Sequence, residues 1–296
     1  MDTDRMIPLT LSLPPELRQH VLRYACILST SFCVALSNLS SWTRTLALPY
    51  LYTTIVVKKY AMSASFWLAI SKPLPVAQLP DFRPSACVKS LWIAPVSNTI
   101  VKIFSRCENI VNFALPAENL HWLVHSTSME PLTTWGQRIK NRMDYQVLVL
   151  EAKRATWSLA HLADETQKTP FFDAVTHLRI AAVGSYSTHL ELAHFKRLSH
   201  IAIPYHRPDI HNLPDLLRIF DFPATIFLVV VLVTDQISSA DYQSALDWVL
   251  QIRTTNQKVY VLDSHSENLQ EEWEDEVRGG LDIWERAEKY TLNLTS

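Results

Sequence analysis

The residues Leu11–Val57 read LSLPPELRQHVLRYACILSTSFCVALSNLSSWTRTLALPYLYTTIVV, and the remainder of the chain is interpreted outward from this stretch. Pro14 and Pro15 lack a backbone N–H and fix φ, so they fit only the start of a helix. Apolar side chains then recur at helical spacing, at Leu17, Val21, Leu22 and Cys26. The pattern predicts an amphipathic helix that breaks at the polar run 29–31.

A second apolar stripe follows in steps of three and four residues. Its members are Val34, Ala35, Leu36, Leu39, Trp42, Leu46 and Ala47. This spacing predicts a second helix with a buried tryptophan. Pro49 is expected to stop that helix, because the residue before a proline is pushed toward an extended conformation. The residues 50–57 that follow predict a strand.

Three short motifs within this stretch occur together. They are Leu13-Pro14-Pro15-Glu16-Leu17, Leu39-Ser40-Ser41-Trp42 and Leu46-Ala47-Leu48-Pro49-Tyr50-Leu51-Tyr52. The combination resembles the F-box family, in particular fungal (mushroom-type) F-box proteins with a degenerate leucine-rich-repeat-like region behind the F-box. The resemblance implies a small helical module that docks on the Skp-type linker subunit of a cullin–RING ubiquitin ligase.

The resemblance also implies which side chains would bind that linker subunit or form the core of the module. They are Leu13, Pro14, Leu17, Val21, Leu36 and Trp42. The middle of the module departs from the family pattern, with Thr30-Ser31-Phe32 in place of a Leu-rich helix and Asn38 in place of an aliphatic residue. The alternative is that these helices only cap the domain behind them, without docking on a ligase.

Beyond residue 58 the pattern apolar-x-x-apolar-x-apolar recurs. It fits Val88–Ile93, Ile110–Leu115, Val175–Ile180 and Leu198–Ile203, and further strand candidates are Tyr145–Leu150, Ile226–Val233 and Val259–Leu262. The first pair of matches is 22 residues apart and the second pair 23 residues apart, within the leucine-rich-repeat range of roughly 20–29. Prolines after three of the matches (Pro95, Pro116, Pro204) are expected to end those strands.

Helical stretches lie between the predicted strands. They are Ile100–Cys107, His189–Phe195, Pro214–Phe220 and, most clearly, Ala240–Arg253. The sequence therefore predicts an α/β fold: a short N-terminal helical F-box-like module followed by an irregular leucine-rich-repeat-like solenoid with parallel strands and outer helices. The expected divisions are 1–57, 58–265 and 266–296. An ordinary mixed α/β domain is the alternative.

Two segments stand apart from the repeat. The insertion Ser126–Asp144 is rich in basic residues, and it either binds a partner or serves as a spacer.

The run from Glu267 to Glu276 is acidic, while Trp273 and its apolar neighbours form a helical stripe. We expect a helix that caps the last hydrophobic edge of the array, with a kink at Gly279-Gly280, a solvated acidic face and, as the alternative, a docking site for a basic target.

Composition narrows the class of protein. The chain is 48% hydrophobic and 19% charged, which is typical of packed globular proteins. Its net charge of −2 predicts no general attraction to nucleic acid or to an anionic membrane. The apolar run Ile226–Val233 is much shorter than the roughly 20 residues that span a bilayer. Four irregularly spaced cysteines match neither a disulfide scaffold nor a zinc site, and Met1–Arg5 is not a secretory signal, so a cytoplasmic or nuclear location is expected.

The sequence offers little for catalysis. Only four glycines occur, and no phosphate-binding or nucleophile-elbow motif is present. His121 and His125 would share a helix face, and His206 and His211 flank Asp209, but neither arrangement has the spacing of a zinc enzyme. We therefore expect no catalytic residues, no metal and no cofactor. His177, Arg179 and His200 occupy variable positions of the repeat pattern, where they either contact a ligand or are solvated.

Together these patterns predict a non-enzymatic adaptor. The first module would bind the Skp-type linker subunit, and the repeat-like region would hold a protein substrate whose identity the sequence does not give. Two alternatives remain open: a stand-alone protein-interaction scaffold, or an enzyme built on the same fold with a His/Asp pocket.

Overall fold

The computed structural model describes residues 13–71, 82–129, 144–150, 170–181, 195–205 and 225–295. In chain order its elements are α1 (Pro15–Leu28), α2 (Thr30–Ser37), α3 (Ser41–Leu51), β1 (Thr54–Val57), α4 (Tyr60–Ser71), α5 (Pro84–Cys87), β2 (Ser90–Ile93), α6 (Thr99–Arg106), β3 (Asn112–Pro116), α7 (Ala117–Met129), β4 (Tyr145–Leu150), α9 (Pro170–Ala174), β5 (Val175–Ile180), β6 (His200–Tyr205), β7 (Phe227–Val233), α11 (Ser239–Arg253), β8 (Val259–Ser264), the 3-10 turn η4 (Ser266–Asn268), α12 (Leu269–Val277) and α13 (Ile283–Thr295).

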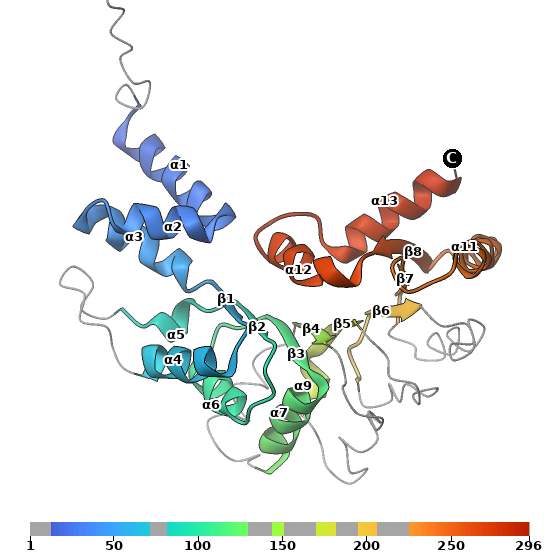
Figure 1. Ribbon diagram of the computed structural model, residues 1–296, viewed down its shortest axis with the longest axis horizontal. Coiled ribbons are helices and arrows are strands. Elements are labelled where there is room, and N and C mark those ends of the chain that lie inside the picture. Colours follow the sequence, from blue (N-terminus) through green and yellow to red (C-terminus); the bar gives the residue numbers. More distant parts are fainter. Residues whose placement is uncertain are drawn as a thin grey trace, which may run out of the picture.

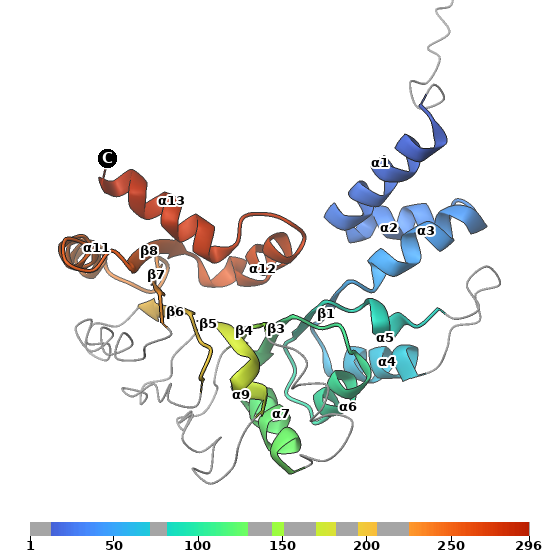
Figure 2. The same ribbon diagram turned by 180° about the vertical axis from the view of Figure 1, so that it is seen from behind.

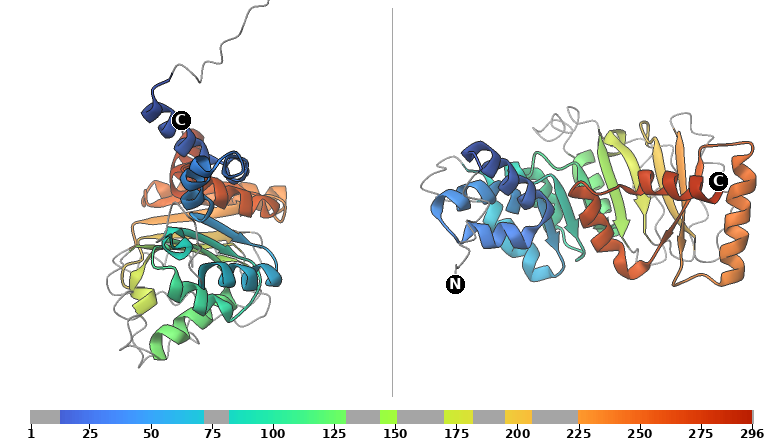
Figure 3. Two further views of the ribbon diagram at one scale, coloured as in Figure 1. Left: turned by 90° about the vertical axis from the view of Figure 1, so that its left-hand side faces the viewer. Right: turned by 90° about the horizontal axis from the view of Figure 1, so that it is seen from above.

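The eight strands form one sheet in which spatial order follows chain order and every neighbouring pair is parallel. Seen from above, the strands lie side by side along the length of the molecule (Figure 3). Helices α4, α6, α7 and α9 lie on one face of the sheet, and α12 and α13 lie on the other (Figures 1 and 2). The predicted α/β class and the parallel strands are confirmed, and each strand predicted beyond residue 58 coincides with an observed one to within two residues at either end.

The alternation of the repeat pattern explains the main core. One in-register row of side chains crosses the sheet toward α4, α6, α7 and α11. Its members are Ile55, Leu91, Phe113, Val147, Leu178, Ile201, Leu228 and Val259. Apart from the partly buried Ile55, these side chains are at most 3% exposed and belong to a single apolar cluster. Burial of such a continuous row on parallel strands is the main driving force for packing these helices against the sheet.

The opposite face, here called the open face, carries two kinds of row. The first is polar and in register, and consists of Thr54, Ser90, Asn112, Gln146, His177 and His200. The second, two residues further along each strand, is mostly apolar and includes Val56, Trp92, Ala114, Leu148, Ala202 and Val229. Side chains of α12 and α13 cover the apolar row, notably Trp273 against Trp92 with ring centroids 5.5 Å apart.

The N-terminal module contains three helices rather than the two predicted. The Ser29 hydroxyl accepts the N–H of Phe32 at 3.2 Å and starts α2, and Ser40 forms a capping box with Thr43 that starts α3. The sequence predicts the break at 29–31, whereas the cap at Ser40 divides the apolar stripe that spacing alone presents as continuous. Pro49 does not end α3, because its fixed φ is helical and only one backbone N–H is missing from the last turns.

Two further strand predictions need correction. The strand predicted over 50–57 begins only at Thr54, and it is the first strand of the sheet rather than part of the helical module. Pro204 lies within β6 instead of ending it. Pairing of β6 with β5 stops at Ala202, so no neighbouring carbonyl there requires the N–H that proline lacks.

The C-terminal segment forms two helices, and part of it reaches the outer edge of the last strand, where the Thr291 hydroxyl of α13 accepts the N–H of Val261 at 2.9 Å. Most of the segment lies across the open face, because its apolar side chains pack on the apolar row there and its carboxylates pair with arginines. Gly279, with φ of +100°, makes the turn between α12 and α13. Next to it, Arg278 donates to the Ile27 carbonyl oxygen at 3.3 Å and to the Thr30 hydroxyl. This contact ties the C-terminal segment to the N-terminal module.

Candidate functional site

The first candidate site is the outer surface of α1. Leu22 and Cys26 turn inward to a small core shared with Cys33, Leu36 and Leu46. A second apolar stripe faces solvent, and its members are Leu13, just before the helix, and Leu17, Val21, Tyr24 and Leu28 on it, of which Val21 is 58% exposed. A helix that needed only to pack on its own module would carry polar residues there. Clustered exposed apolar side chains of this kind are typical of protein–protein contact surfaces.

The predicted partner-binding residues divide into two groups. Leu13, Pro14, Leu17 and Val21 all lie exposed on the α1 side, and Trp42 on α3 is 53% exposed instead of buried. Leu36 is 4% exposed and belongs to the core of the module, so it supports the surface from beneath. Trp42 is exposed because the capping box at Ser40 starts α3 in an orientation that turns Leu46 and Ala47 inward instead.

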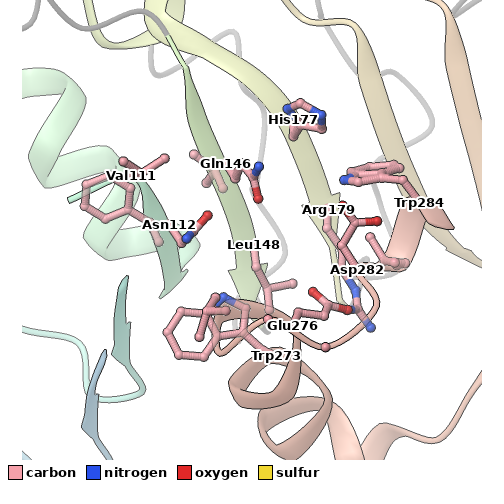
Figure 4. A pocket seen from close by; sticks show the side chains of 16 residues that line it. Val111, Asn112, Gln146, Leu148, His177, Arg179, Trp273, Glu276, Asp282 and Trp284 are labelled. Atoms are coloured by element: carbon pink, nitrogen blue, oxygen red, sulfur yellow. The ribbon is translucent and has the colours of Figure 1, made fainter. Parts of the chain in front are cut away.

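The second candidate site is a cavity of about 350 Å³ between the open face and the α12–α13 turn (Figure 4). Successive strands contribute Asn112, Gln146 and His177 from the polar row to its floor. Trp273 and Trp284 line it from α12 and α13. Because consecutive parallel strands are about 4.8 Å apart, in-register polar side chains make a continuous strip across the floor.

The charged side chains beside the cavity form a compact network. Arg179 donates to Glu272 at 3.0 Å and to Glu276 at 3.3 Å, and Arg286 donates to the same two carboxylates at 3.2 and 2.6 Å. Burial raises the pKa of Glu272, but attraction to the two arginines outweighs it and the net shift is downward. The two arginines and two glutamates thus neutralise one another. The acidic run is therefore not simply a solvated face.

Asp282 is the remaining charged residue of the cavity lining. Its Oδ1 accepts the N–H of Glu285 at 2.8 Å and so caps the start of α13. Its Oδ2 accepts no hydrogen bond from the residues that the structure describes. The side chain points toward the cavity beside Arg179 and below Trp284 (Figure 4).

Stacked rings continue from the cavity across the open face. The rings of His177 and His200 stack with centroids 4.2 Å apart, and Trp284 lies 5.5 and 5.2 Å from them. The hydroxyls of Thr176 and Ser199 lie 2.9 and 2.8 Å from the two Nδ1 atoms. Each hydroxyl also lies near a carbonyl oxygen of the preceding strand, at 3.5 and 3.2 Å. These contacts fix the orientation of the two imidazole rings.

This environment disfavours protonation of both rings. Burial lowers the pKa of His177, although Asp282 and Asp144 act in the opposite direction. Burial, reinforced by the neighbouring His177, lowers the pKa of His200 to about 4. The unfolded chain therefore binds these protons at a higher pH than the folded protein does. The contribution of the stack to stability is fully present above about pH 6.5 and is lost as the pH falls toward about 4.

We expect the free energy of unfolding to fall by about 1 to 2 kcal/mol between about pH 7 and about pH 5, allowing for solvent screening of these half-buried rings. Urea unfolding at the two pH values measures the change. The double variant His177→Gln/His200→Gln should lose most of this pH dependence, since neither new side chain titrates. A pH dependence equal to that of the unchanged protein would contradict the assignment.

The other histidine clusters do not form metal sites in the part of the chain that the structure describes. His121 and His125 share an exposed face of α7, with ring centroids 6.2 Å apart. Among the described residues no group of three His, Cys, Asp or Glu side chains is placed to hold a metal ion. His206, Asp209 and His211 lie outside the described residues, as do the predicted helix Pro214–Phe220, most of His189–Phe195 and most of the basic insertion.

No protein-family model, no curated protein and no solved structure matches this chain. Among the described residues, no helix combines the length and the apolar character needed to cross a bilayer. Inference about function therefore depends on the two surfaces themselves.

Sequence reasoning found part of the cavity and missed the rest. It placed His177 and Arg179 on one face of a strand, where they meet a possible ligand, and the structure places both at the cavity. It missed Asn112, Gln146, Trp273, Asp282 and Trp284. Asn112 and Gln146 occupy the same register position as His177, so the strand pattern could have predicted that they share its face of the sheet. The sequence carries no comparable signal for the contact of α12 and α13 with the open face.

Proposed function

We propose that this protein is a non-enzymatic substrate-recognition adaptor of a Skp–cullin–F-box type ubiquitin ligase. Helices α1–α3 would dock on the Skp-type linker subunit, and the open face of an irregular leucine-rich-repeat-like array would hold a protein target. The observation that carries the proposal is the exposed apolar stripe of α1, which the module's own core does not use. Such an adaptor acts by holding its target near the ubiquitin-charged enzyme, and it needs no chemistry of its own.

The position of the module is compatible with linker binding by α1–α3 and target binding by the open face. Arg278 connects the α12–α13 turn to α1 and α2, while the outer stripe of α1 stays exposed. A docked linker subunit would therefore leave the cavity accessible at the other side of that turn. The strand order supports the array, because a parallel sheet built strictly in chain order is typical of solenoids.

The test is co-purification of the full chain with a fungal Skp-type linker subunit after co-expression. We expect the double variant Leu17→Asp/Val21→Asp to weaken linker binding by at least about 30-fold, because each buried interface side chain contributes 1 to 2 kcal/mol. Both side chains are exposed in the free protein, so the melting temperature should change little. Leu13→Ala/Pro14→Ala and Trp42→Ala should each weaken binding by a smaller factor.

The matched control is Leu68→Asp/Leu292→Asp. These leucines lie on α4 and α13 and are 61% and 50% exposed, so the control introduces the same charges at similar exposure away from α1. It should bind the linker subunit like the unchanged protein. Equal recovery with both double variants would count against docking through α1. Failure of the unchanged chain to bind any linker subunit, together with stable expression as a monomer, would instead favour a stand-alone interaction scaffold.

A further inference from the structure

The cavity carries a net negative charge at neutral pH. Arg179 and Glu276 line it, but both belong to the network in which two guanidinium groups and two carboxylates cancel. His177 is neutral, because burial lowers its pKa. The carboxylate of Asp282 is the remaining charge. An anionic ligand such as a phosphate would meet this carboxylate and an arginine whose charge is already balanced by two carboxylates, so the cavity disfavours anions.

The walls of the cavity suit an organic cation. Trp273 and Trp284 are each at most 8% exposed and contribute indole rings from two helices. Indole is the aromatic group that attracts a cation most strongly. Asp282 lies beside Trp284 (Figure 4), so a cation against this ring would be partly desolvated and would have Asp282 as its counter-ion, while Trp273 lines the other end of the cavity. The volume of about 350 Å³ accommodates a long, flexible cationic side chain and not a folded domain.

The floor suits a peptide backbone. Asn112 and Gln146 present amide groups side by side on β3 and β4, and each amide offers both donors and an acceptor. Gln146 is exposed. The polar row continues to Ser90, to whose hydroxyl the Asn112 amide donates at 3.2 Å. An extended segment lying along this row would find partners for its own N–H and C=O groups.

We propose that the cavity binds a lysine or arginine side chain of an extended target segment, with Asp282 as the counter-ion, Trp273 and Trp284 as the walls, and Asn112 and Gln146 holding the backbone. The proposal rests on the adaptor function in one respect, since it names the chemical class of the target that the array would hold. A basic peptide motif, rather than a phosphorylated or acidic one, is then the feature that the protein recognises.

Four pools of fluorescein-labelled pentapeptides test this, with Arg, Lys, Gln or Glu fixed at the centre and uncharged residues varied around it. Fluorescence polarisation with the full chain, without any linker subunit, measures binding. The Arg and Lys pools should bind at least about tenfold more tightly than the Gln and Glu pools. Equal binding of all pools, absence of binding, or a preference for the Glu pool would overturn the proposal.

Asp282→Asn removes the counter-ion while keeping an oxygen that accepts the Glu285 N–H, so α13 stays capped. It should reduce the preference for basic pools to within about threefold of the Gln pool. Gln146→Lys places a competing cation at the floor and should weaken binding of the Arg pool by at least about tenfold. Glu288→Gln is the matched control, since it removes the same charge from an exposed position of α13 and should leave the preference intact.

The same variants separate this inference from the adaptor function. Asp282→Asn should co-purify with the linker subunit as well as the unchanged protein does, because α1 is untouched. A preference for basic peptides that persists in Asp282→Asn would rule out the cavity as their binding site, whatever the outcome of linker docking.

Discussion

Phe113→Ala is expected to lower the free energy of unfolding by about 3 to 5 kcal/mol. Phe113 lies in β3, is 1% exposed, and belongs to the row of side chains that faces the covering helices. Its ring centroid is 5.4 Å from those of Phe104 and Tyr145 and 6.1 Å from that of Phe171. Removal of the ring leaves a cavity in a cluster of rigid aromatic groups, which cannot collapse to fill it.

Urea unfolding monitored by circular dichroism measures the change. The control is Trp122→Ala on α7, which removes a larger ring that is 43% exposed. Because nearly half of this side chain is in water and its removal leaves no enclosed cavity, we expect the control to cost at most about half as much. Comparable losses for the two variants would mean that the cluster around Phe113 is not the packed centre of the sheet.

Arg179→Met should also cost about 3 to 5 kcal/mol, through electrostatics rather than packing. Arg179 is 5% exposed and donates to both Glu272 and Glu276. Without it, two carboxylates under α12 share the single guanidinium of Arg286. An uncompensated buried carboxylate is costly, so we expect α12 to detach from the open face before the rest of the sheet unfolds. Hydrogen exchange of α12 and thermal unfolding report the two events.

Two variants make this prediction specific. Lys196→Met breaks the exposed pair between Lys196 and Asp173 and should cost no more than about 1 kcal/mol. Arg179→Met/Glu276→Leu removes one charge of each sign and should recover more than half of the loss, because no carboxylate is then left in excess. Protection of α12 that does not change in Arg179→Met would rule out a role for this network in holding the helix.

The strands were predictable because their signal is local. Alternating side chains in Val175–Ile180 place Leu178 and Ile180 on one face and His177 and Arg179 on the other, and the structure shows this arrangement. The 22-residue step between matches fixes the register of β2 with β3. The helix predicted over Ala240–Arg253 is present as α11. Periods of two and of 3.6 residues follow from backbone geometry alone, so a single sequence reveals them.

The N-terminal module was predictable only in part. The spacing of Trp42 places it on an apolar stripe, but which part of that stripe meets the core depends on where α2 ends and α3 begins. The cap at Ser40 decides that division, and it is a weak signal for a helix start because Thr43 stands where a capping box usually has Glu or Gln. The side chains expected to dock are therefore more exposed than spacing alone predicts.

By itself the sequence determined the alternation of strands and helices, the inward face of each strand, and the apolar character of the first helix. Only the tertiary structure decided that α12 and α13 cross the open face, so that Asp282 meets a cavity floored by Asn112, Gln146 and His177. The physical reason is that the two kinds of interaction act over different distances along the chain. Backbone geometry sets a pattern within a few residues. The proximity of residues 177 and 282 depends instead on where every strand between them lies. It also depends on which exposed row of the sheet best matches the apolar and acidic faces of α12 and α13.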